Sequence, residues 1–428
     1  MRIIQLTPGT GSFHCGSCLR DHALVRALHG LGHRVTMVPM YLPLVVEHDD
    51  EHAAPRPVRY GGVNVYLQQK APWLRRTPAW LHRLLDSPRL LRRVARRSGM
   101  TRARLVGDIT LSVLNGEDGR QKNELDRLVA SIADEQPDVV CLSNALLVGL
   151  AGAIRARLRV PVVCTLQGED AFLDALPESV RDEAWRTLAR RAADVDALIG
   201  VSRYYADTMT RRLGLASDRV HVVHNGIDLE GFPEPGAAPD PPVLGYFARM
   251  CADKGLGTLI DAFLQLKCRP DTGRLRLHVA GAMTRSDEAY VRALQQRLGP
   301  VADDVRWQPN PDRRGKLDML AGLSVFSVPA TYGEAFGLYV IEALASGVPV
   351  VQPRHGAFEE VIGATGGGVL CAADDPTALA DAIETLIVDE PKRRALAAEG
   401  RRNVHARFGA DRMAAEVIAI LESVQPRD

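Results

Sequence analysis

The chain has 428 residues, which suits two domains better than one, and its apolar content of 46% supplies material for two cores. Lysine and arginine together number 53 against 52 acids, so the net charge of +1 gives no bulk field that favours a nucleic-acid partner. The lack of a secretory signal and of an apolar run long enough to span a bilayer predicts a cytoplasmic protein.

Strand-like runs alternate with helix-period segments in the first half of the chain. This alternation predicts a parallel sheet with helices on both faces. The expected strands are Arg2–Thr7, Arg34–Pro39, Val139–Ser143, Val160–Leu166, Ala197–Val201 and Val220–Val223, and the expected helices include Leu19–Leu31, Glu124–Ala133 and Glu183–Ala193.

A basic segment, Lys70–Arg104, interrupts the alternation. It carries eleven lysines and arginines against a single acid, Asp86, and its apolar residues recur at helical spacing. We predict a basic helical insertion in the first domain. Two interpretations stay open: contact with a membrane surface or an anionic, lipid-linked acceptor at the inner membrane face, or a helical cover over the first sheet.

A second strand–helix series follows a Pro/Gly-rich segment, Leu229–Pro242, which reads as a linker. We therefore predict an α/β protein with two Rossmann-like, doubly wound domains at 1–228 and 243–408, and a terminal helix at 409–428 that packs back on the first domain. Ligands of such sheets bind at the carboxyl ends of strands, so we expect a site in the cleft between the domains. The expected strands are Val243–Phe247, Leu275–Ala280, Val305–Gln308, Ser324–Pro329 and Pro349–Gln352, and the expected helices are Gly257–Leu266, Asp287–Leu298, Arg314–Ala321, Phe336–Ser346, Thr377–Leu386, Pro391–Phe408 and Ala410–Val424.

Two cations, Arg249 and Lys254, follow the first strand of the second domain and precede a helix. A strand's carboxyl end and a helix N-terminus both favour anions. Only six of the 53 basic residues are lysines, so a lysine in this loop is a notable choice. The pair predicts a diphosphate site.

Two carboxylates, Glu334 and Glu342, lie eight positions apart around the start of a later helix. Glu334 is placed to accept hydrogen bonds from sugar hydroxyls. The backbone N–H groups of 335–338 (Ala335, Phe336, Gly337 and Leu338) are expected to point into the same space. Glu342 stands in an otherwise apolar segment, so it must be paired or solvated by a ligand, and a ribose diol is a reasonable partner.

These motifs together resemble the retaining family 4 glycosyltransferases of GT-B fold. The likeness rests on Arg249 and Lys254, on Glu334 with Glu342, on Ala345–Val351 (ASGVPVV), and on Gly356 with Glu360 and Val361. It covers the second domain, extends to His224–Asp228, and is looser in the first domain, through Gly30–Val35 (GLGHRV).

The resemblance implies a hexose transfer from a UDP-, GDP- or ADP-sugar to a hydroxyl acceptor with retained anomeric configuration. It implies that Arg249 and Lys254 hold the diphosphate and stabilise the leaving nucleotide, and that Glu334 acts at the sugar and Glu342 at the ribose. It also implies that Asn310 lies near the base, and that the loop containing Gly11 and Gly16 approaches the phosphates through its backbone.

The chain departs from the family pattern in two places. Gln167 stands where many relatives carry a histidine; Gln keeps hydrogen-bonding capacity but cannot carry a proton. The neighbouring Glu169 and Asp170 are candidates to contact or orient the acceptor, or to cap a helix. In addition, Gly11–Cys18 replaces the paired glycines of relatives.

Metal chemistry has weak support in the sequence. The only D-x-D motif is Asp194–Asp196, at a helix end in the first domain, and Cys15-x-x-Cys18 has no second cysteine pair. We expect no metal and no cofactor, and a packing role for the two cysteines.

Four other functions compete with the transferase. A Rossmann dehydrogenase would need a third glycine where His14 stands. A phosphorylase of the pyridoxal type shares the fold but would need a cofactor lysine in the second domain, where few lysines are available. A nucleotide-sugar epimerase of the same fold and a non-catalytic sugar-nucleotide binding protein both stay open.

Overall fold

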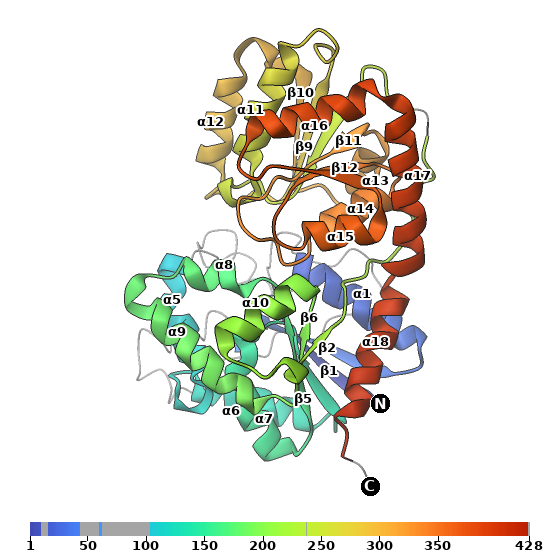
Figure 1. Cartoon of the computed structure of the whole chain (residues 1–428). Helices are drawn as coiled ribbons and strands as arrows, with labels where there is room; N and C mark the ends of the chain where they lie inside the picture. Colours follow the sequence, from blue (N-terminus) through green and yellow to red (C-terminus); the bar gives the residue numbers. More distant parts are fainter. Residues whose placement is uncertain (10–15, 43–59, 62–102, 237, 427–428) are drawn as a thin grey trace. The chain divides into compact units, whose positions relative to one another are not determined.

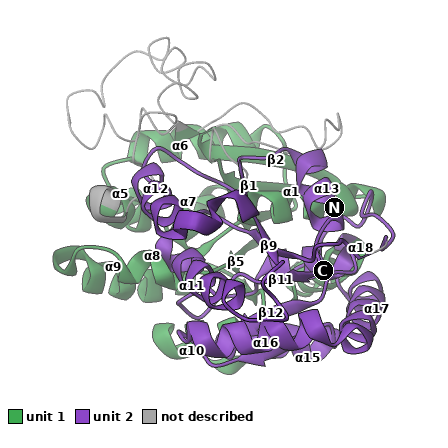
Figure 2. Cartoon of the chain, turned by 90° about the horizontal axis from the view of Figure 1, so that it is seen from above, with its two compact units in different colours: residues 1–224, 411–428 green, residues 225–410 purple. Residues whose placement is uncertain are grey.

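The computed structural model describes residues 1–9, 16–42, 60–61, 103–236 and 238–426. The chain divides into two compact units, drawn in different colours in Figure 2. Unit 1 consists of Met1–His224 together with Asp411–Asp428, and unit 2 is Asn225–Ala410. The boundary at His224 therefore precedes the segment 229–242, which belongs to unit 2. Residues 70–102 of the predicted basic insertion Lys70–Arg104, together with Gly11, lie outside the described residues, and residues 103–104 begin a helix, Ala103–Leu114.

Unit 1 contains a parallel sheet in the order β3-β2-β1-β4-β5-β6-β7. The strands are β1 (Arg2–Pro8), β2 (Arg34–Tyr41), β3 (Tyr60–Gly61), β4 (Val139–Leu142), β5 (Val162–Leu166), β6 (Ala197–Gly200) and β7 (Val220–Val222). Every residue of β4, β5 and β6 is buried, as expected of parallel strands covered on both faces.

The helices of unit 1 lie between successive strands, except the last one, which follows unit 2 at the end of the chain (Figure 1). They are α1 (Gly16–Gly30), α5 (Ala103–Leu114), α6 (Lys122–Ala133), α7 (Ala151–Leu158), α8 (Glu169–Asp174), α9 (Glu178–Arg191), α10 (Arg203–Leu213) and the terminal α18 (Ala410–Ser423). Arg412 of α18 donates to the His224 carbonyl at 2.8 Å, and Gln425 donates to the Asp138 carbonyl at 3.3 Å. These bonds attach the end of the chain to unit 1.

Unit 2 contains a second parallel sheet in the order β10-β9-β8-β11-β12-β13. The strands are β8 (Val243–Phe247), β9 (Arg276–Gly281), β10 (Val305–Pro309), β11 (Val325–Phe326), β12 (Val350–Pro353) and β13 (Gly368–Cys371). The helices are α11 (Leu256–Lys267), α12 (Glu288–Leu298), α13 (Arg313–Ala321), α14 (Leu338–Ala345), α15 (Phe358–Thr365), α16 (Pro376–Val388) and α17 (Glu390–Arg407).

Strand order reverses once in each sheet, between β1 and β4 in unit 1 and between β8 and β11 in unit 2. Crossovers between parallel strands are right-handed, so each reversal puts helices on both faces of its sheet. This is the doubly wound α/β arrangement that the sequence predicts. The reversal point is also where such sheets bind ligands, beyond the carboxyl ends of the strands.

Two predicted boundaries near the strand–helix loop of β11 and α14 are wrong. The strand expected at 324–329 is limited to Val325–Phe326. The helix expected from Phe336 begins at Leu338, because Gly337 has φ +84°, a left-handed conformation that cannot belong to an α-helix. Ala335 and Phe336 therefore lie in the loop before α14. Within the described ranges, no helix has both the length and the apolar character needed to cross a bilayer.

Candidate active site

The loops that follow β8 and β11 meet at the reversal point of unit 2. Lys254 ends a short 3₁₀ turn, Ala252–Lys254, and Gly255 follows it with φ +69°. A Cβ on Gly255 would clash with the Pro329 carbonyl, so the close approach of the two loops requires glycine there. Thr331 N–H donates to the Asp253 carbonyl at 3.0 Å and ties the loops together.

Lys254 and Glu334 form an ion pair across these two loops. Lys254 Nζ lies 2.5 Å from Glu334 Oε2 and also donates to the Tyr332 hydroxyl. Burial alone would raise the pKa of Glu334, but the Lys254 ammonium and the hydrogen bonds to its carboxylate outweigh that effect and lower it. Burial likewise opposes the charge of Lys254, but Glu334 outweighs it and raises the lysine's pKa. Both groups are therefore charged at neutral pH.

Two tyrosines that the sequence analysis did not identify complete this cluster. The Tyr339 hydroxyl donates to Glu334 Oε2 at 2.8 Å, and the Tyr332 hydroxyl lies 3.4 Å from the same oxygen. The ammonium of Lys254 also lies 4.9 Å from the ring centre of Tyr332 and 5.5 Å from that of Tyr339. The only sequence feature that could have pointed to these tyrosines is their closeness to Glu334, two positions before it and five after it.

The two oxygens of Glu334 have different environments. Oε2 accepts hydrogen bonds from the Lys254 ammonium and from the hydroxyls of Tyr332 and Tyr339. Oε1 accepts no hydrogen bond from any residue that the structure describes. The carboxylate is thus fixed through one oxygen, and the other is left for a ligand hydroxyl.

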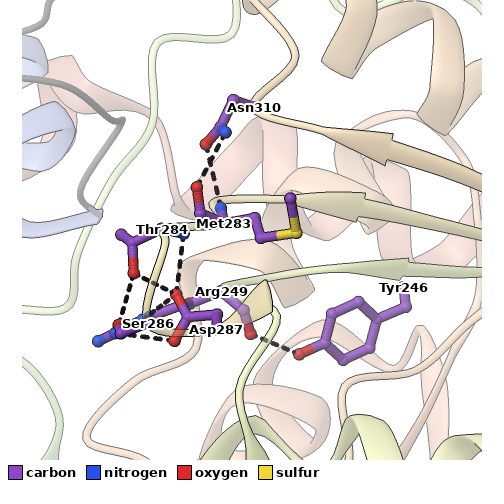
Figure 3. Close-up of polar contacts among 7 residues, drawn as sticks. All are labelled: Tyr246, Arg249, Met283, Thr284, Ser286, Asp287 and Asn310. Carbon is purple, nitrogen blue, oxygen red and sulfur yellow. Dashed lines mark hydrogen bonds and ion pairs between the residues drawn. The ribbon is translucent and has the colours of Figure 1, made fainter. Parts of the chain in front are cut away.

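Arg249 is held at its side chain and at its backbone (Figure 3). Its Nη2 donates to Asp287 Oδ1 at 3.0 Å and its Nε to Oδ2 at 3.3 Å. Thr284 supplies Oδ2 with two more donors, the backbone N–H at 2.9 Å and the hydroxyl at 2.7 Å. The buried Tyr246 hydroxyl donates to the Arg249 carbonyl at 2.8 Å. From the sequence, Asp287 was predicted only as the first residue of a helix.

Glu342 of α14 is paired with Lys316 of α13. Lys316 Nζ lies 2.8 Å from Glu342 Oε1, and the two side chains are only 3% and 13% exposed. A carboxylate in an apolar helix was expected to need a partner or a ligand, and the structure supplies a buried lysine 26 positions earlier in the chain.

Asn310 organises the ends of β9 and β10. Its side-chain amide and the backbone of Met283 exchange two hydrogen bonds of 3.0 Å each (Figure 3), and its N–H donates to the Gly281 carbonyl at 2.8 Å. Beside it lies a hollow of about 240 Å³. Met250, Met283, Val291, Trp307 and Pro309 line it, together with Glu288, Arg292 and Gln295.

The three candidates in unit 1 lie where β5 ends. Gln167 Nε2 donates to the Ser143 carbonyl at 2.6 Å. Glu169 is 4% exposed and accepts from the Ala145 N–H at 2.8 Å and the Tyr205 hydroxyl at 2.9 Å. Burial raises the pKa of Glu169. Asp170 Oδ1 is buried without a hydrogen-bond partner among the described residues.

The remaining sequence candidates have ordinary surroundings. Gly16 is the first residue of α1, and Cys18 Sγ donates to the Pro8 carbonyl at 2.7 Å. Asp196 of the D-x-D motif pairs with Arg155 at 3.0 Å and accepts from the Val162 N–H at the amino end of β5, opposite the carboxyl ends of the strands. Across the described part of the chain, no three histidine, cysteine, aspartate or glutamate side chains are grouped as a metal site would require.

Two doubly wound units, one with a cation–carboxylate cluster at its reversal point, are the GT-B class of fold. Residues 230–403 match the family model described as glycosyl transferases group 1, and residues 113–230 match the model described as glycosyltransferase family 4. The chain therefore belongs to the group 1, family 4 glycosyltransferases.

Curated relatives agree with that assignment, and solved structures share the fold. The chain is 32% identical to a D-inositol 3-phosphate glycosyltransferase of Xylanimonas cellulosilytica, over 65% of this chain and 70% of the relative. It is 30% identical to a lipopolysaccharide core biosynthesis mannosyltransferase of Rhizobium meliloti, over 57% and 70%. A sucrose-phosphate synthase structure from Thermosynechococcus elongatus is similar with TM-score 0.73 at 18% identity, covering 99% of both chains. An Anabaena protein solved with UDP and glucose is similar with TM-score 0.68 at 18% identity, covering 99% of this chain and 100% of the other.

Proposed function

We propose that the chain is a retaining glycosyltransferase that moves a hexose from a nucleoside-diphosphate sugar to a hydroxyl acceptor without a metal ion. One observation carries the proposal: two cations, Arg249 and Lys254, lie in the loop after β8 at the reversal point of unit 2, and each is held in place by a carboxylate, Asp287 for the arginine and Glu334 for the lysine. The donor's diphosphate, sugar and ribose each have a candidate partner in this part of unit 2.

Arg249 and Lys254 are proposed to bind the diphosphate. Asp287 uses the Nε and Nη2 of Arg249, whereas Nη1 donates to no described residue and can reach an anion. Two of the three N–H donors of the Lys254 ammonium bond to Glu334 and Tyr332. The third is left for a phosphate oxygen. Because cleavage of the anomeric C–O bond builds negative charge on the leaving diphosphate, donors fixed in advance lower the barrier.

Glu334 and Glu342 are proposed to bind the sugar and the ribose. The Oε1 atom of Glu334 is the acceptor for donor-sugar hydroxyls, since its Oε2 is already taken by Lys254 and Tyr339. Glu342 is held by Lys316 at Oε1, so its other oxygen is available to a ribose hydroxyl.

The hollow beside Asn310 is the proposed seat of the base. Its apolar walls and its volume of about 240 Å³ suit a planar heterocycle, and Glu288, Arg292 and Gln295 can hydrogen-bond base edges. The solved Anabaena relative binds UDP, which makes a UDP-sugar the first donor to test here, with GDP- and ADP-sugars next.

In unit 1, we propose that Glu169 orients rather than contacts the acceptor, because the backbone and Tyr205 occupy its carboxylate. Gln167 and Asp170 are the proposed contacts. Retention is proposed to follow from front-face attack, in which the departing phosphate takes the proton of the acceptor hydroxyl. The basic insertion favours an anionic or lipid-linked acceptor.

A thermal-shift panel of UDP, GDP, ADP and their common sugars, with and without EDTA, tests donor binding. We expect stabilisation by one nucleotide family and no effect of EDTA. NMR of the product from the stabilising donor should show the donor's anomeric configuration, and free nucleotide should be released faster when an acceptor is present, which an epimerase would not show. Loss of binding in EDTA, or an inverted product, contradicts the proposal.

A further inference from the structure

The Arg249–Asp287 ion pair fixes the direction of the Arg249 side chain. Asp287 is 7% exposed at its side chain, whereas Arg249 is 32% exposed, so the acid is anchored and the guanidinium reaches outward. Because Nε and Nη2 both bond to this carboxylate, the plane of the guanidinium is fixed as well as its position.

Asp287 is itself tightly held. Thr284 donates its N–H and its hydroxyl to Oδ2, and Ser286 lies 2.7 Å from the Thr284 hydroxyl. Figure 3 shows these side chains gathered on one side of Arg249 and Tyr246 holding the arginine's carbonyl on the other. The loops after β8 and β9 are also in close contact, since a Cβ on Gly281 would clash with the Ala248 carbonyl.

We propose that Asp287 is a positioning residue for the transfer reaction, aiming Nη1 of Arg249 at the donor's diphosphate. The inference rests on the proposed function and adds a residue from a third loop to it. Asp287 does not touch the donor. It acts only through Arg249, and therefore matters most when charge develops on the leaving group.

The Arg249–Asp287 ion pair also reduces the net positive charge of the site when no donor is bound. Burial opposes ionisation of Asp287, but its bonds from Thr284 and Arg249 prevail and lower its pKa, so it is anionic at neutral pH. Loss of the Asp287 charge would strengthen the electrostatic attraction between Arg249 and a phosphate in the ground state. It would also leave the guanidinium without a fixed orientation. In donor binding, the stronger attraction and the lost orientation of Arg249 oppose each other. In the rate of bond cleavage, the lost orientation is expected to dominate.

The test is the variant Asp287→Asn, measured as nucleotide release from the sugar nucleotide that stabilises the protein among UDP-glucose, GDP-mannose and ADP-glucose. We expect kcat to fall about 10- to 100-fold, the cost of a small misplacement, with little change in KM. The same substitution placed in an Arg249→Ala background should cause no further loss, because the group through which Asp287 acts is gone.

Asp304→Asn is the matched control. It breaks an ion pair of the same unit, Lys267–Asp304 at 2.9 Å, beside the amino end of β10 rather than the carboxyl edge, and should keep wild-type kinetics. Equal losses from Asp287→Asn in both Arg249 backgrounds, or a loss matched by Asp304→Asn, overturn the inference and indicate a purely structural role. Failure of the proposed function looks different, because the wild type itself would then bind and cleave none of the three donors.

Discussion

Replacing Lys254 with methionine should destabilise unit 2 through Glu334. The substitution keeps a long apolar stem but removes the ammonium 2.5 Å from Glu334 Oε2. The carboxylate stays buried with only the Tyr339 and Tyr332 hydroxyls as donors. An uncompensated buried charge is costly, which makes this variant a sensitive probe of the cluster.

The magnitude follows from the burial of the pair. Breaking a buried ion pair from one side costs about 3–5 kcal/mol. The side chains of Lys254 and Glu334 are 21% and 12% exposed and the tyrosines remain, so we expect about 3 kcal/mol, near the lower limit. For a unit of this size, that corresponds to a fall of about 6–12 °C in the thermal midpoint.

The assay is thermal unfolding of Lys254→Met, Glu334→Gln and the double variant. The double variant should recover part of the loss, because it no longer buries an unpaired charge. The folded pKa of Glu334 lies below its ordinary 4.5, so the stabilisation is complete above that pH and is lost as the pH falls through the folded pKa. The gap between wild type and Lys254→Met should therefore be widest near neutrality. Equal midpoints, or purely additive effects, would show that Lys254 and Glu334 do not form a stabilising pair.

Further substitutions address the ligand-binding roles. Glu334→Ala should abolish turnover and largely keep nucleotide binding; equal activity by nucleotide release would remove Glu334 from the mechanism. Lys316→Met should weaken binding of a whole nucleotide but not of inorganic pyrophosphate, measured by titration calorimetry, with the exposed Lys392→Met as control. Tyr339→Phe should cost about 1–2 kcal/mol of stability by removing one hydrogen bond to a buried carboxylate, and an unchanged unfolding midpoint would contradict that bond.

The sequence predicted most strands of both sheets because the central strands, such as β4, β5 and β6, are fully buried and are separated by clear helical periods. It did not predict β13, whose first three residues are only half-buried. It also placed Arg249, Lys254 and Glu334 at strand ends, and the reversal of strand order between β8 and β11 explains why these loops come together. Local signals were sufficient for each residue taken separately.

The partners of those residues could not be predicted from sequence. Asp287 is 38 positions from Arg249, Lys316 is 26 from Glu342, and Lys254 is 80 from Glu334. Their pairing depends on which strands are neighbours and on how loops cross, which periodicity does not contain. An acid at a helix start, such as Asp287, looks like an ordinary N-terminal residue until the neighbouring loop is seen. The start of α14 was predicted at Phe336 rather than at Leu338, because periodicity does not show that Gly337 is left-handed.

The most direct test of the donor site is a crystal structure with a bound sugar nucleotide. We predict electron density for the diphosphate beside Arg249 and Lys254, for the sugar beside Glu334 and for the ribose beside Glu342. Density elsewhere on the protein, with Arg249 and Lys254 facing bulk solvent, would contradict it.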